Sequence, residues 1–106
     1  GRADLILGDN HGHAAARAVM NAASETLRAR GRRVQHNNPY AGGHTTRHYG
    51  VPGDGVHALQ VEINRGLYVT RAGAPDAAAL AALADDLAAV FRALAALPER
   101  PLRPAR

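Results

Sequence analysis

The chain has 106 residues, of which 46% are apolar and 4% aromatic, and it contains no cysteine. This length suits one domain with an aliphatic core, and the lack of cysteine excludes disulfides and thiolate metal sites and favours a cytoplasmic protein. The net charge is +4, and all 13 basic residues are arginines. Because these arginines are scattered without interleaved aromatic residues, the pattern argues against a nucleic-acid binder. The sequence shows neither a signal peptide nor an apolar run long enough to cross a membrane.

Five segments with a regular pattern follow one another in the order strand, helix, strand, strand, helix. Apolar periodicity and turn residues predict them at residues 4–8, 13–30, 32–36, 56–64 and 75–97. Residues 37–55 are rich in Asn, Gly and Pro and are predicted to form a loop. The order predicts an α/β domain over residues 1–98, with helices packed on a small sheet, followed by an Arg- and Pro-rich tail at 99–106.

The last predicted helix carries an apolar residue at every third or fourth position. The stripe comprises Leu80, Leu83, Leu87, Val90, Leu94 and Leu97. This spacing fits either a coiled-coil seam or a helix face packed on the sheet. Because the segment is shorter than four heptads, packing on the sheet is the favoured interpretation. Pro75 is expected in the first turn of this helix.

Side chains of a strand alternate between two faces, which divides residues 56–64 into an apolar and a polar set. The apolar set is His57, Leu59, Val61 and Ile63, and the polar set is Ala58, Gln60, Glu62 and Asn64. We expect the apolar set to lie under a helix, with His57 buried and hydrogen-bonded. Glu62 is then either an ordinary solvent-facing residue or a carboxylate at the floor of a cleft, able to deprotonate water.

The loop before this strand contains residues suited to binding a small ligand. The adjacent Gly42 and Gly43 let the backbone approach a ligand closely, and the guanidinium of Arg47 matches a carboxylate group. We expect this loop to form the wall of the cleft. His11 and His13 form an H-x-H pair, but the local spacing places no third ligand beside them, so a structural or solvent-exposed role is expected.

The stretches NPYAGGHTTRHYG and GVHALQVEINRGLY resemble the C-terminal signature of the N-formylglutamate amidohydrolases, and DLILGDNHG is similar to the stretch that precedes it. The resemblance implies hydrolysis of N-formyl-L-glutamate to L-glutamate and formate, a step of histidine degradation. It also implies a fold like the C-terminal part of the zinc carboxypeptidases and aspartoacylases. Glu62 matches the catalytic general base, and Arg47 is the candidate for binding a substrate carboxylate. The other matching loop residues, expected to bind substrate, are Asn38, Gly42, Gly43, Thr46, His48 and Tyr49.

The same resemblance implies a Zn²⁺ cofactor, whose ligands in the family lie in an N-terminal half without a counterpart in these 106 residues. No metal ligand is therefore assigned, and the chain alone is not expected to hydrolyse the substrate at a family-like rate. Two interpretations stay open: the substrate-loop and general-base half of a hydrolase, or a non-catalytic carboxylate-binding or oligomerising α/β protein derived from the family. The expected partners are an N-acyl amino acid substrate and further copies of the chain.

Overall fold

The structure is a computed structural model that describes residues 3–38, 50, 52–54 and 56–98. The predicted order of strands and helices is confirmed. The elements are β1 (Leu5–Gly8), α1 (Arg17–Ala29), β2 (Val34–His36), the 3-10 helix η1 (Pro52–Asp54), β3 (Gln60–Ile63), the 3-10 helix η2 (Arg65–Leu67) and α3 (Ala77–Ala95). Within the described residues, no helix has the length and hydropathy needed to cross a bilayer.

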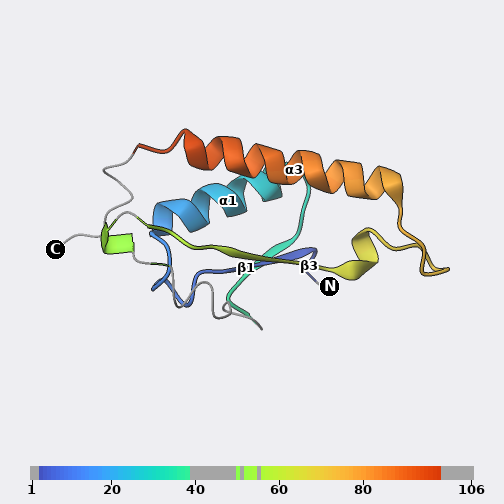
Figure 1. Cartoon of the computed structure of the whole chain (residues 1–106), viewed down its shortest axis with the longest axis horizontal. Helices are drawn as coiled ribbons and strands as arrows, with labels where there is room; N and C mark the ends of the chain where they lie inside the picture. The colour runs from blue at the N-terminus through green and yellow to red at the C-terminus, as the bar shows by residue number, and fades with distance from the viewer. Residues whose placement is uncertain (1–2, 39–49, 51, 55, 99–106) are drawn as a thin grey trace.

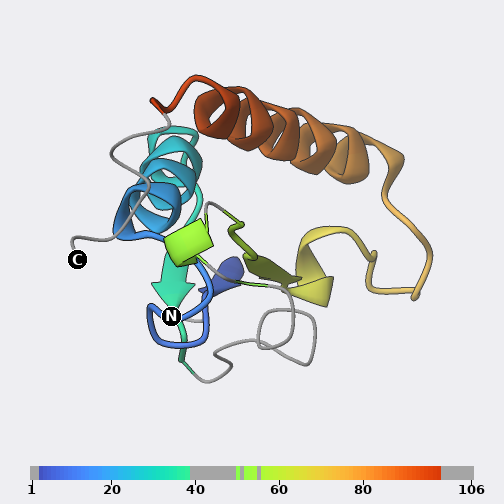
Figure 2. The same ribbon diagram turned by 60° about the vertical axis from the view of Figure 1, so that its left-hand side comes forward.

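The three strands form one sheet in the order β2-β1-β3, so the first strand of the chain is the central one. β1 pairs in parallel with β2 and antiparallel with β3. Both α-helices lie on the same side of this sheet, as Figures 1 and 2 show from two directions. The sheet therefore has one face covered by helices and one face that these helices leave open.

The core fills the space between the sheet and the two helices. Leu5 and Leu7 of β1 are fully buried there. The buried cluster consists of Leu5, Leu7, Met20, Ala23, Leu27, Val34 and Val90, with Leu59, Val61, Ile63, Leu87 and Leu94 packed against it. Alternation on β1 and β3 produces this arrangement, because every second side chain of these strands points to the helices.

The apolar stripe of α3 serves the core over most of its length, and the most extensive contact of α3 is with α1. Leu83 and Val90 are buried and Leu87 is partly buried, which confirms packing as the main role of the stripe. Its first member, Leu80, is 42% exposed, and Phe91 beside the stripe is 70% exposed. The helix therefore leaves some apolar surface in contact with solvent.

Four elements begin at least two residues later than predicted: β2 starts at Val34 and not at residue 32, α3 starts at Ala77 and not at residue 75, and two starts differ by more. The first helix begins at Arg17 and not at residue 13, because the main-chain N–H of Ala14 bonds back to the carbonyl of Asp9 in a turn. The third strand begins at Gln60 and not at residue 56, since Gln60 pairs with Gly8, the last residue of β1. The preceding Ala58 donates its N–H to the carbonyl of Ala14 instead.

Ionic and capping interactions fix α3 in place. Asp76 is the N-cap, and its carboxylate accepts a hydrogen bond from the N–H of Ala79 at 3.1 Å. Pro75 therefore lies before the helix and not in its first turn. The buried carboxylate of Asp86 accepts hydrogen bonds from Arg30 at 2.5 Å and from Arg32 at 2.7 Å. This pair of bonds ties the middle of α3 to the segment that joins α1 to β2.

Candidate functional site

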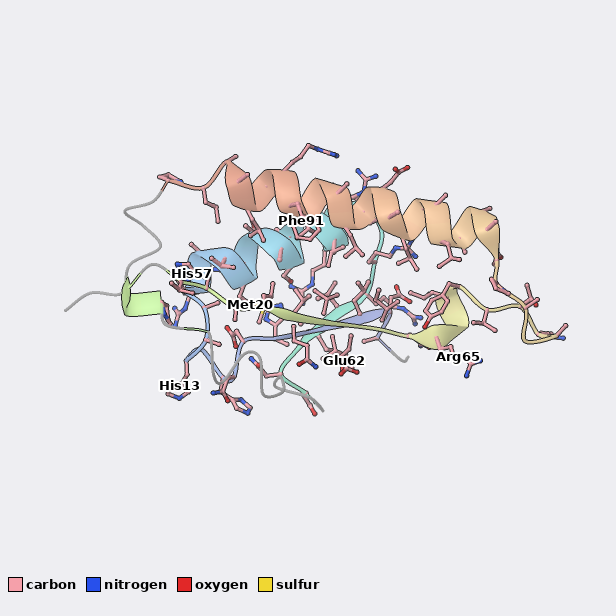
Figure 3. All side chains as sticks on the ribbon, viewed as in Figure 1. His13, Met20, His57, Glu62, Arg65 and Phe91 are labelled. Atoms are coloured by element: carbon pink, nitrogen blue, oxygen red, sulfur yellow. The ribbon has the colours of Figure 1, made fainter. Side chains whose placement is uncertain are left out.

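Glu62 lies on the face of the sheet opposite the helices (Figure 3). The strand register explains this placement, because Glu62 pairs with Ile6, whereas Val61 pairs with the buried Leu7. The side chain of Glu62 is exposed, while that of Val61 packs against the core. The alternation predicted for this strand is therefore confirmed, and Glu62 does not belong to the helix-covered core.

Gln60, two residues earlier on the same face, orients the Glu62 carboxylate. Its side-chain Nε2 donates a hydrogen bond to Glu62 Oε1 at 2.9 Å. Residues i and i+2 of a strand stand on the same side, so this contact follows directly from the strand geometry. The hydrogen bond from Gln60 thus holds one oxygen of the carboxylate, and the side chain as a whole is exposed to solvent. An oriented carboxylate that water can reach is able to bind or deprotonate a water molecule.

The structure tests only part of the predicted substrate loop. Asn38 is described and is exposed, two residues after the end of β2. Gly42, Gly43, Thr46, Arg47, His48 and Tyr49 lie outside the described residues. The approach of Arg47 to Glu62, and the cleft between them, therefore stay predictions.

Asp9 and Asn37 form a polar pair that the sequence analysis did not single out. They follow β1 and β2, whose parallel alignment brings their carboxyl ends to the same edge of the sheet. Asn37 Nδ2 donates to Asp9 Oδ1 at 2.9 Å, and the main-chain N–H of Asp9 donates to Asn37 Oδ1 at 3.0 Å. Ligand sites of α/β proteins commonly lie at this end of the strands. The signal in the sequence was the position of both residues directly after a predicted strand, although only β1 (LILG) is apolar and β2 (VQH) is not.

The histidines outside the loop take structural or exposed positions. His11 and His13 are exposed in the turn after β1, in agreement with the prediction. His57 is partly buried, and its Nδ1 accepts a hydrogen bond from the N–H of Ala16 at 3.0 Å, as expected of a hydrogen-bonded histidine. Because Nδ1 is the acceptor, Nε2 carries the hydrogen in the neutral ring. Among the residues that the structure describes, this buried atom has no hydrogen-bond partner.

His36 faces α1 from the end of β2. Its Nε2 lies 2.8 Å from the hydroxyl oxygen of the buried Ser24. Burial and the positive charge of Arg28 lower the pKa of His36, while the carboxylate of Asp9 acts in the opposite direction. The environment beneath the helix therefore favours the neutral form of this histidine, which is not a component of the exposed face that carries Glu62.

The described residues do not fit the zinc site that the family resemblance implies. A catalytic zinc ion needs about three protein ligands. Among the residues that the structure describes, no group of three His, Asp or Glu side chains is placed to hold a metal ion. No chemical step is therefore assigned to a metal in this chain.

The fold and the site define an α/β protein with a carboxylate on the open face of a small sheet. Comparisons with known proteins identify the family to which this protein belongs. The family model of N-formylglutamate amidohydrolase matches residues 1–69. This match covers more than half of the chain and includes β1, α1, β2 and β3. The chain therefore belongs to the N-formylglutamate amidohydrolase family. A search of curated proteins gives no significant match.

Among solved structures, the chain is similar to the crystal structure of N-formylglutamate amidohydrolase from Ralstonia eutropha JMP134. The TM-score is 0.77 and the sequence identity is 26%. The match covers 89% of this chain but 34% of the other chain. The chain thus spans about a third of that relative, and the match confirms the arrangement of its sheet and helices.

Proposed function

We propose that the chain carries the substrate loop and the general base of a hydrolase that resembles N-formylglutamate amidohydrolase and acts in histidine degradation. The observation that supports this most directly is the exposed Glu62 carboxylate, within the family match, on the face opposite the helices (Figure 3). Its neighbour Gln60 fixes one carboxylate oxygen. The proposal includes kinship with the zinc carboxypeptidase and aspartoacylase fold, and a cytoplasmic location.

In the proposed reaction, the Glu62 carboxylate takes a proton from a water molecule whose oxygen attacks the formyl carbon of N-formyl-L-glutamate. The tetrahedral intermediate collapses, the carbon–nitrogen bond breaks, and Glu62 returns the proton to the leaving amine nitrogen. The second proton of the water leaves with formic acid, which ionises to formate. Arg47 holds a carboxylate of the substrate through paired N–H···O bonds.

The second candidate function is binding of an N-acyl amino acid without hydrolysis. The observation that favours it is that the described residues hold no group of three His, Asp or Glu side chains placed for a metal ion, while the loop signature and Glu62 are present. The two candidates share the same ligand and the same binding residues. They differ only in whether formate is released.

Calorimetric titration of the 106-residue polypeptide with N-formyl-L-glutamate, together with a formate assay with and without added Zn²⁺, tests both candidates. We expect binding, and we expect Arg47→Ala to weaken it by about 10- to 100-fold, since bonds to a charged group are lost. Arg71→Ala, at an exposed position between η2 and α3, is the matched control and should bind like the wild type. Binding with formate release supports the hydrolase, binding without release supports the second candidate, and no binding contradicts both.

Self-association is part of the proposal, because α3 leaves apolar side chains exposed. Phe91 and Leu80 both lie on this helix and are 70% and 42% exposed. Burying such surface between copies of the chain removes it from water. Light scattering at micromolar concentration should show a mass above that of a monomer, and a concentration-independent monomer would contradict this part of the proposal.

A further inference from the structure

The turn between β1 and α1 has a backbone conformation that is costly for its residues. Asn10 and His11 have φ angles of 53° and 54°, and Asn37, which contacts the turn, has a φ of 57°. Residues other than glycine adopt such left-handed conformations infrequently, although Asn and His do so more often than most. Strain of this kind persists only where surrounding interactions hold it in place.

Hydrogen bonds to Asp9 and Asn37 supply that support. Asp9 is 5% exposed, and its Oδ1 accepts from the N–H of Gly12 and from Asn37 Nδ2, both at 2.9 Å. Asn37 Oδ1 accepts from the N–H groups of Asp9 at 3.0 Å and His11 at 3.3 Å. The side-chain amide of Asn37 therefore uses both its oxygen and its nitrogen to fasten the end of β2 to the turn.

The same turn also holds the chain at the other end of the predicted substrate loop. Gly50 lies so close to Ala14 that a Cβ atom on Gly50 would be 2.5 Å from the Ala14 carbonyl oxygen and 2.7 Å from its Cα. A little further on, Ala58 donates its N–H to that carbonyl at 2.9 Å, and the N–H of Ala16 donates to His57 at 3.0 Å. Gly50 therefore contacts this turn, and His57 and Ala58, which lie shortly before β3, are hydrogen-bonded to it.

We propose that the turn at residues 9–16 is a common anchor for both ends of the segment between Asn37 and Gly50, and that Asp9 and Asn37 are positioning residues of the candidate site. They act through the chain that they hold and not through contact with the ligand. One turn thereby fixes Asn37 at the end of β2, Gly50, and Ala58 shortly before the strand that carries Glu62. This inference rests on the proposed function for its ligand.

Substitutions at each end of the segment test the anchor through the affinity for N-formyl-L-glutamate. Asn37→Asp removes the donor and places a second carboxylate beside Asp9, and Gly50→Ala forces a methyl group into the Ala14 backbone. We expect each to weaken binding by at least about tenfold, because displaced binding groups lose alignment. The control Asn21→Asp makes the same change on exposed α1, and Gly53→Ala adds a methyl group where no atom lies within 4 Å. Both controls should bind within about twofold of the wild type.

Amide hydrogen exchange separates a common anchor from two independent contacts. Asn37→Asp should accelerate exchange at Ala58, whose N–H bonds to the far side of the turn, and Gly50→Ala should accelerate exchange at Gly12. Exchange at Leu7 in the central strand should stay slow in both variants. If Asn37→Asp unfolds the chain, Asn37→Gly removes the side-chain bonds while it tolerates the left-handed backbone.

The outcomes distinguish this inference from the proposed function. Wild-type binding that both variants weaken, with exchange effects across the turn, supports the anchor. Unchanged affinity in either folded variant, or exchange effects confined to the substituted end, overturns it. If the wild type does not bind the ligand, the proposed function fails, and the exchange data alone decide whether the anchor is correct.

Discussion

The two faces of the sheet differ in composition, in cover and in role. Towards the helices the strands present Leu7, which is fully buried, and its partner Val61, which packs against the core. On the opposite face Ile6 stands beside Glu62, with Gln60 bonded to the carboxylate. Neighbouring residues of one strand therefore serve different purposes: alternate side chains stabilise the fold, and the residues between them are available for chemistry.

This difference predicts that changes on the two faces have separable consequences. A substitution on the open face should alter ligand chemistry and leave the free energy of unfolding nearly unchanged. A substitution on the helix-covered face should do the reverse.

The largest expected effect is on turnover. Under the proposed function, Glu62→Gln should reduce kcat by about 10²- to 10⁴-fold, because it removes the proton acceptor and keeps the shape of the side chain. The free energy of unfolding should change by less than about 0.5 kcal/mol, since Glu62 is exposed. Steady-state formate release and urea unfolding measure the two quantities. Glu25→Gln, an exposed change on α1, is the control, and full turnover in Glu62→Gln would refute the assignment of the base.

Shortening two neighbouring side chains of β1, one on each face of the sheet, compares how much each face contributes to the free energy of unfolding. Leu7→Ala should lower the free energy of unfolding by about 2–5 kcal/mol, since it opens a cavity among fully buried side chains. Ile6→Ala, on the open face and only partly buried, should cost clearly less. Urea denaturation followed by circular dichroism gives both values. Equal losses would mean that the open face is packed as tightly as the covered one.

The third prediction concerns the ionic contact that holds α3 over the covered face. Asp86→Ala should lower the free energy of unfolding by about 2 kcal/mol, because two charged hydrogen bonds are lost, although the half-exposed Arg30 regains contact with water. Asp85→Ala, at the exposed neighbouring position, should have little effect. Burial raises the pKa of Asp86, but hydrogen bonds from Arg30 and Arg32 outweigh it and lower the pKa. The stabilisation is therefore present near neutral pH and is lost as the pH falls below 3.8, the ordinary value.

The smallest effect is a pH dependence that originates on the covered face. Since burial lowers the pKa of His36, the unfolded chain binds the proton more tightly, and stability should fall as the pH drops below 6.5, the ordinary value. His36→Gln should reduce the decrease in Tm between about pH 7 and pH 5. His13→Gln, at an exposed position, should not. A His36→Gln protein with the pH profile of the wild type would show that other groups are responsible.

Periodicity was sufficient to predict the parts of the molecule that depend on alternation or helical repeat. The two-residue period from Leu59 to Ile63 correctly placed Glu62 on the open face, and the spacing of Leu83, Leu87 and Val90 correctly indicated packing. These patterns are local, and they depend only on which side chains leave water. The sequence therefore established the order of the elements and the face of the candidate base.

Features that depend on contacts between distant segments were not predictable in this way. The segment around Ala14 and Ala15 has high helix propensity, yet it forms a turn because Asp9, Gly50 and Ala58 hold it from three other parts of the chain. The pairing of Asp9 with Asn37 likewise requires two strand ends to meet. Propensity is a weak guide where tertiary contacts decide the backbone conformation.

The position of β1 at the centre of the sheet has a consequence for the order of folding. Leu5 pairs with Val34 on one side and with Ile63 on the other, and Ile63 is twice as far along the chain. The β1-α1-β2 unit can therefore assemble during synthesis while β3 has not yet emerged. Doubling the length of a closed loop costs only about 0.6 kcal/mol in chain entropy, so the greater distance of β3 along the chain destabilises the folded sheet little. Contacts between distant residues nevertheless form more slowly during folding. The strand that carries the candidate base is then the last to join the sheet.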